Sequence, residues 1–110
     1  MSTISTVAIL GAGQMGAGIA QAVALGGYSV RLYDVASGRL PLAQGEIAAS
    51  LARQAGRGLV DRAAADDALA RIVLTGGIAE AVADARRVIE MEEVLDAISV
   101  WGLRWGTTSA

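Results

Sequence analysis

Three glycines stand at a spacing that suits phosphate binding. Gly11, Gly13 and Gly16 follow the pattern G-x-G-x-x-G, which alone is weak in a chain with fourteen glycines. Between a strand and a helix, the first glycine permits a tight turn, the second lets a pyrophosphate approach the backbone, and the third lets the helix pack closely. Backbone N–H groups of the loop and of the first helical turn then attract the phosphates. Gln14 and Met15, between these glycines, are further candidate cofactor contacts, although Met15 also suits the apolar core.

An acidic residue follows the glycines at an informative distance. Asp34 closes the next predicted strand, near the spacing of about 20 residues typical of dinucleotide-binding units. A carboxylate there accepts hydrogen bonds from the adenosine ribose and repels a 2′-phosphate, which predicts NAD rather than NADP. Arg39 is an alternative phosphate clamp, to which we give less weight. Two structural alternatives stay open: Asp34 caps the following turn, or the glycine loop holds no ligand.

The composition excludes several kinds of chemistry. The 110 residues contain no histidine, cysteine or lysine, so all nine basic side chains are arginine. An imidazole base, a thiolate nucleophile, the usual zinc site, a Schiff base and a lysine-bearing P-loop are therefore excluded, and we expect no metal. No disulfide can form. The formal net charge of −2 gives no electrostatic reason to expect nucleic acid, and six arginines are expected to be solvated: Arg53, Arg57, Arg62, Arg71, Arg86 and Arg87.

The apolar character of the chain raises the question of a membrane. Hydrophobic residues make up 54%, the mean hydropathy is +0.48, and residues 1–30 carry no charge. A spanning helix needs roughly 20 mostly apolar residues, whereas this segment is interrupted by six glycines and lacks a positive leader. We therefore expect a buried strand–turn–helix unit, no membrane contact, and a cytoplasmic location.

Apolar spacing around the glycine loop predicts alternating strands and helices. Strands are expected over residues 7–10, 28–33, 72–75 and 88–90. Helices are expected from residue 14 to the glycines at 26–27, from about residue 39 to the break at 56–58, after Asp61, and over 78–85. The inward-facing stripes are expected to be Met15, Ile19 and Val23; Leu40, Ala43, Ile47 and Leu51; and Ala65 and Leu69.

This order predicts an α/β fold. It is a partial Rossmann-type unit, a first βαβαβ half with a short C-terminal extension, in which helices cover both faces of a parallel sheet. Residues 1–90 form the dinucleotide-binding unit. Residues 91–110 belong to the same domain, as a helix over 91–99 followed by a strand or a tail.

One protein family combines these features. Residues 7–21, V-A-I-L-G-A-G-Q-M-G-A-G-I-A-Q, closely resemble the N-terminal segment of the 3-hydroxyacyl-CoA dehydrogenases, which include bacterial 3-hydroxybutyryl-CoA dehydrogenases. The M-G-x-G-I-A-Q continuation is considerably more specific than the glycine pattern. Similar segments recur at 32–34, 50–51, 56–59, 68–72 and 88–90, so the resemblance covers residues 4–90 nearly continuously.

The resemblance implies a two-domain oxidoreductase of fatty acid metabolism. An NAD-binding domain and a helical dimerisation domain enclose a hydroxyacyl-CoA. NAD takes hydride from the 3-hydroxyl carbon while a histidine, oriented by a glutamate, removes the hydroxyl proton. On this chain Gly11, Gly13 and Gly16 would hold the pyrophosphate and Asp34 the adenosine ribose. Glu90 would face the cofactor from the end of its strand.

The resemblance weakens after Glu90. Family members continue with an A-V-x-E segment and a lysine, whereas this chain continues Met91-Glu92-Glu93. Residues 107–109 faintly resemble an N-T-S segment of the family, which would give Ser109 a substrate contact. Because no histidine is present, the catalytic set is expected to be absent.

Three functional hypotheses follow. The first is an NAD-binding Rossmann domain that is catalytically incomplete alone, with acyl-CoA as a further partner and a homodimer as its assembly. The second is an active oxidoreductase completed by a partner chain or a homodimer. The third is a non-catalytic scaffold with an empty glycine loop.

Overall fold

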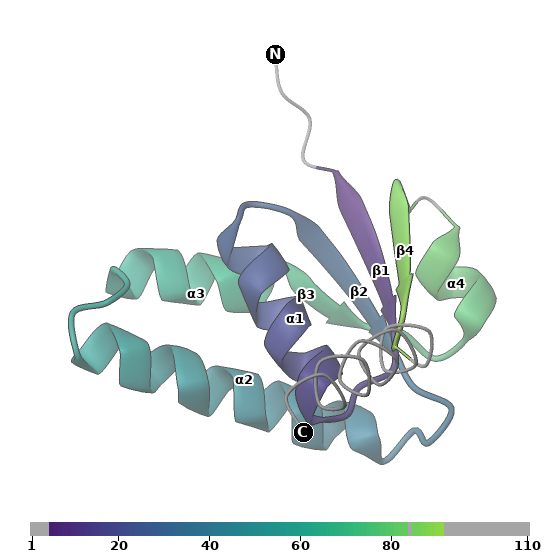
Figure 1. Ribbon diagram of the computed structural model, residues 1–110, viewed down its shortest axis with the longest axis horizontal. Coiled ribbons are helices and arrows are strands. Elements are labelled where there is room, and N and C mark those ends of the chain that lie inside the picture. Colours follow the sequence, from purple (N-terminus) through teal and green to yellow (C-terminus); the bar gives the residue numbers. More distant parts are fainter. Residues whose placement is uncertain (1–4, 84, 92–110) are drawn as a thin grey trace, which may run out of the picture.

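A four-stranded parallel sheet lies at the centre of the structure (Figure 1). The computed structural model describes residues 5–83 and 85–91. Within them the predicted order of strands and helices is confirmed. The elements are β1 (Thr6–Leu10), α1 (Gln14–Leu25), β2 (Ser29–Tyr33), α2 (Arg39–Gly56), α3 (Arg62–Ala70), β3 (Ile72–Leu74), α4 (Ile78–Val82) and β4 (Arg87–Glu90).

The sheet order explains where a ligand can bind. The strands lie in the order β3-β2-β1-β4, and each neighbouring pair is parallel. The chain therefore proceeds outward from β1 to β3 and then crosses to the other side of β1 to form β4. In Figure 1, α1, α2 and α3 lie on one face of the sheet and α4 on the other. Ligands of such sheets bind at the carboxyl ends of the strands, where the strand order reverses. Here that point lies between β1 and β4.

The core lies between the sheet and the three longer helices. Ile9 of β1 and Leu32 of β2 are fully buried and lie opposite each other in the sheet register. Helix α2 packs mainly on α1 and α3 and buries one stripe toward the core, which confirms the prediction from its spacing: Leu40, Ala43, Ile47 and Leu51. Pro41 lies in the first turn of α2, where a missing backbone N–H costs nothing.

Helix α1 packs on a different face from the one that we predicted. The expected core position of Met15 is wrong, because this side chain is 38% exposed. Ile19 and Val23 are only partly buried. The buried face consists of smaller residues and one glutamine: Gly16, Ala17, Ala20, Gln21 and Ala24. Small residues let the helix lie close to the sheet, and this close approach leaves the larger side chains at its margins.

Two other details differ from the prediction. Helix α4 ends at Val82, three residues earlier than expected. Arg71 is not simply solvated, because it is partly buried and its Nη1 donates to the Ala24 carbonyl oxygen at 2.9 Å, near the end of α1.

The C-terminal predictions are not tested by the structure. Residues 92–110 lie outside the described residues, so the domain limit at residue 90, the helix over 91–99 and its extension stay predictions. Among the described helices, none is long and apolar enough to cross a membrane.

Candidate functional site

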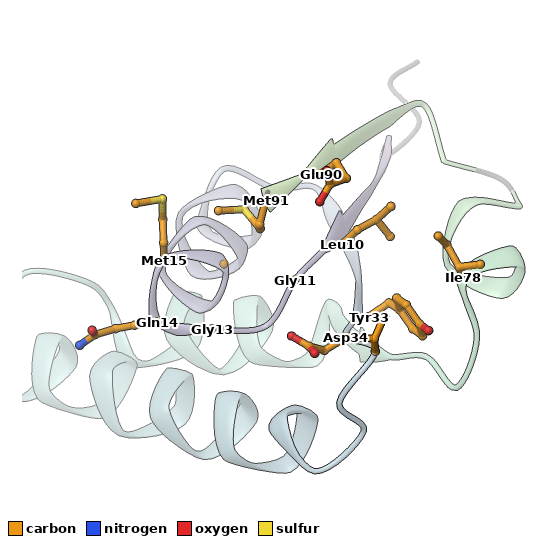
Figure 2. Close-up of a pocket in the computed structure, with 12 residues that line it drawn as sticks. Leu10, Gly11, Gly13, Gln14, Met15, Tyr33, Asp34, Ile78, Glu90 and Met91 are labelled. Carbon is orange, nitrogen blue, oxygen red and sulfur yellow. The ribbon is translucent and has the colours of Figure 1, made fainter. Parts of the chain in front are cut away.

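A cavity opens at the carboxyl end of the sheet, between the ends of β1, β2 and β4 (Figure 2). Its volume is about 620 Å³. All five residues of the glycine pattern that are candidate cofactor contacts line it, together with side chains from β1, β2 and α4. The lining residues are Leu10, Gly11, Gly13, Gln14, Met15, Gly16, Tyr33, Asp34, Val35, Ile78, Glu90 and Met91.

Gly11 makes the turn out of β1 in a conformation that favours glycine. Its φ is +129°, and its N–H donates to the Tyr33 carbonyl oxygen at 2.7 Å. The buried side chain of Met91 packs directly against it. A Cβ at this position would lie 2.7 Å from Met91 Cβ and 2.8 Å from Met91 Cγ. The predicted tight turn is therefore confirmed, and close packing gives a second reason for a glycine.

Gly16 brings the first turn of α1 against this same turn. A Cβ on Gly16 would collide with the Gly11 carbonyl oxygen. The glycine loop and the helix are thus in direct backbone contact, which confirms the close packing that the sequence predicts. Any larger residue at position 16 would push the start of α1 away from the loop.

Gly13 presents open backbone. A Cβ built here would meet nothing within 4 Å, and the residue is exposed at the cavity wall. Gly13 is also the N-cap of α1, and a glycine has no side chain with which to cap the helix. The first intrahelical bond runs from the Ala17 N–H to the Gly13 carbonyl oxygen at 2.8 Å. The N–H groups of Gln14, Met15 and Gly16, which precede Ala17 in the first turn of α1, have no intrahelical acceptor. These free donors at the start of the helix fit a phosphate group.

Asp34 lies directly opposite the glycine loop, with its carboxylate directed toward it in Figure 2. Its Oδ2 accepts a hydrogen bond from the Ala12 N–H at 2.7 Å, and its Oδ1 accepts one from the Ala36 N–H at 2.8 Å. The second contact is the turn cap that the sequence offers as an alternative role for Asp34. Each carboxylate oxygen has a further lone pair, so these two contacts leave acceptor capacity for a ligand hydroxyl.

Arg39 contacts the backbone of the glycine loop. Its Nε and Nη2 both donate to the Ala12 carbonyl oxygen, at 3.0 and 2.8 Å. Nη2 also lies 3.1 Å from Glu46 Oε1. The alternative of a free phosphate clamp therefore gives way to a guanidinium that is bound to the protein itself.

Apolar side chains complete the cavity wall, and sequence reasoning did not identify them. Val35, directly after Asp34, is 90% exposed, and Ile78 at the start of α4 is 53% exposed. Their exposure and apolar character offer a surface for a flat, apolar group. Val35 directly follows Asp34 in the sequence, and this position could have indicated that it lines the cavity. Ile78 comes from a distant part of the chain, and only the topology brings it to this edge.

Two further candidates were predicted from the family resemblance. Glu90 ends β4 and lines the cavity on the side away from Asp34 (Figure 2). Ser109 lies outside the described residues, so its predicted substrate contact stays a prediction.

Comparisons with known proteins agree with this geometry. The family model of the NAD binding domain of 3-hydroxyacyl-CoA dehydrogenase matches residues 6–100. The 3-hydroxybutyryl-CoA dehydrogenase of Bradyrhizobium diazoefficiens is 42% identical over 89 residues, which are 81% of this chain and 30% of the relative.

Solved structures show the same similarity. The 3-hydroxybutyryl-CoA dehydrogenase of Escherichia coli K12 superposes with a TM-score of 0.74 at 37% identity, covering 81% of this chain and 19% of that one. The (S)-3-hydroxybutyryl-CoA dehydrogenase of Ralstonia eutropha gives 0.73 at 36% identity, covering 80% and 31%. This chain thus spans less than a third of the length of each of these relatives.

Proposed function

Because this chain belongs to the family of NAD binding domains of 3-hydroxyacyl-CoA dehydrogenases, we propose that its cavity binds the adenosine diphosphate half of NAD. A single observation carries the proposal: a glycine turn, the uncapped start of α1 and the Asp34 carboxylate surround one cavity. Each of these three groups matches one part of the ligand.

The pyrophosphate contacts the glycine loop. Gly13 gives it access to the backbone, and the N–H groups of Gln14 to Gly16 face its negative charge. The chain does this without lysine, because the donors are backbone groups.

Asp34 accepts hydrogen bonds from the hydroxyls of the adenosine ribose. A 2′-phosphate at that place would meet a carboxylate, which accounts for a preference for NAD over NADP. The adenine ring lies against the apolar surface of Val35 and Ile78. Gln14, Met15 and Glu90 line the rest of the cavity and contact the remainder of the dinucleotide.

The reaction belongs to the wider proposal. When bound, NAD supplies a hydride acceptor, and the relatives point to a 3-hydroxyacyl-CoA as the donor. The 110 residues contain no histidine, and the resemblance implies a histidine for proton removal. We therefore assign cofactor binding to this chain and proton removal to a residue outside it. A homodimer and a cytoplasmic location stay predictions from the sequence.

Calorimetric titration of the 110-residue chain tests the proposed function. We expect one NAD per chain and an affinity for NADP at least about tenfold weaker, because one repulsive contact of about 1.4 kcal/mol has that effect. Equal affinities would contradict the role of Asp34, and no binding of either nucleotide would favour an empty scaffold.

Ile78→Ser tests the apolar surface. Loss of apolar contact worth roughly 1 kcal/mol should lower the affinity for NAD about three- to tenfold. The affinity for adenosine monophosphate should fall by the same factor, because both ligands carry the adenine. The matched control is Leu42→Ser on α2, since Leu42 is 59% exposed and does not line the cavity. Equal losses from the two variants would argue against an adenine contact at Ile78.

A further inference from the structure

We propose that Arg39 is a positioning residue that sets the conformation of the glycine loop for dinucleotide binding. The inference rests on the proposed function, because it concerns the same cavity. Arg39 does not line that cavity. It acts through a peptide group of the loop rather than through the ligand.

The Ala12 residue is the point of contact. Its side chain is fully buried, and it stands between Gly11 and Gly13. Its N–H donates to Asp34 Oδ2 at 2.7 Å, while its carbonyl oxygen accepts from Arg39 at 3.0 and 2.8 Å. Both polar groups of this residue are therefore fixed from the region just after β2. Because glycines flank Ala12, few steric limits would otherwise restrict its two peptide groups.

The guanidinium suits this task better than a simple positive charge. Two donors of one rigid, planar fork meet a single carbonyl oxygen, so the contact restricts direction as well as distance. Arg39 is itself held: its backbone N–H donates to the Ala36 carbonyl oxygen at 2.9 Å, and Glu46, two turns along α2, contacts Nη2 at 3.1 Å. Its side chain is 31% exposed, so most of it is shielded from water.

A chain of contacts thus joins the ribose acceptor to the phosphate loop. Asp34 and Arg39 hold opposite ends of Ala12, and Gly13 beyond it carries the open backbone. Loss of the guanidinium frees the Ala12 carbonyl and lets the adjoining Gly13 N–H rotate away from the phosphate position. Binding of the phosphates should therefore depend on Arg39, whereas binding of the nucleoside part should not.

Three variants of the full 110-residue chain separate positioning from charge. Arg39→Gln removes the charge and the fork, Arg39→Lys keeps only the charge, and Arg57→Gln removes an exposed arginine at the C-terminal end of α2. The first measurement is the rate of hydrogen exchange at the Ala12 amide in the ligand-free chain, monitored by NMR. The second is the affinity for NAD, ADP and adenosine.

Positioning predicts a specific combination of results. In Arg39→Gln and in Arg39→Lys, the Ala12 amide exchanges at least about tenfold faster, and NAD and ADP bind about tenfold more weakly. The affinity of both Arg39 variants for adenosine should change by less than about twofold. Arg57→Gln should match the unsubstituted chain in every measurement.

Other results would overturn the inference. Full recovery of NAD affinity in Arg39→Lys would show that charge alone matters, and unchanged exchange at Ala12 would show that the loop does not depend on Arg39. Failure of the unsubstituted chain to bind NAD contradicts the proposed function instead. In that case the exchange of Ala12, which needs no ligand, decides the inference by itself.

Discussion

Gly16→Ala is expected to weaken NAD binding by about tenfold or more. The added methyl group would collide with the Gly11 carbonyl oxygen, so α1 or the loop must move. Overpacking of this kind costs about 1–3 kcal/mol of folding free energy. The movement also turns one or two N–H donors away from the phosphate. Each lost hydrogen bond costs roughly 1.5–3 kcal/mol of binding free energy. Calorimetry with NAD, together with urea unfolding, measures the two effects separately.

A neighbouring glycine provides the matched control for this variant. Gly18 lies in the same helix, is exposed, and a Cβ there would meet nothing within 4 Å. Gly18→Ala should stabilise the fold by about 0.5–1 kcal/mol, since alanine is the better helix former. Its NAD affinity should stay within about twofold of the unsubstituted chain. If Gly16→Ala also left NAD affinity unchanged, the close contact of helix and loop would have no part in binding.

Asp34→Asn is expected to weaken NAD binding by about 10- to 100-fold. The amide keeps one acceptor oxygen, so it cannot serve Ala12, Ala36 and the ribose as the carboxylate does. Hydrogen bonds to a charged acceptor are worth about 1.5–3 kcal/mol, which gives that range. Parallel titrations with NAD and NADP measure it.

The ratio of the two affinities identifies the role of Asp34. If Asp34 selects the cofactor, Asp34→Asn removes the repulsion of the 2′-phosphate. The preference of the chain for NAD over NADP should then fall by about tenfold. A residue that only supports the loop would weaken both ligands by one factor, and that outcome would refute the selector role. Asp66→Asn, an exposed acidic residue on α3, controls for the change in net charge.

Local pattern was sufficient for the elements but not for every packing face. The stripe of α2 could be predicted because Leu40, Ile47 and Leu51 recur at helical spacing and face the core. The large apolar residues of α1 predict the wrong face, because its contact with the sheet is made mainly by alanines and Gly16. A pattern that weights large side chains misses an interface built for close approach.

The site was predictable to the extent that it follows a known motif spacing. Ala12 of the glycine loop and Asp34 are 22 residues apart, near the spacing typical of dinucleotide-binding units, and the ends of adjacent parallel strands bring them together. The clamp of Arg39 on Ala12 spans 27 residues and depends on how α2 begins. Ile78 reaches the cavity only because α4 covers the opposite face of the sheet. Such contacts follow from the assembled fold rather than from spacing.

Titration of the isotope-labelled chain with NAD, followed through its amide resonances, tests most directly whether this cavity holds the cofactor. We predict saturable shifts at Gly13 in the loop, at Gln14 at the start of α1 and at Val35 beyond Asp34, with the amides of α3 unchanged. Saturable shifts confined to α3, or no saturable shift at any amide, would contradict NAD binding at this cavity.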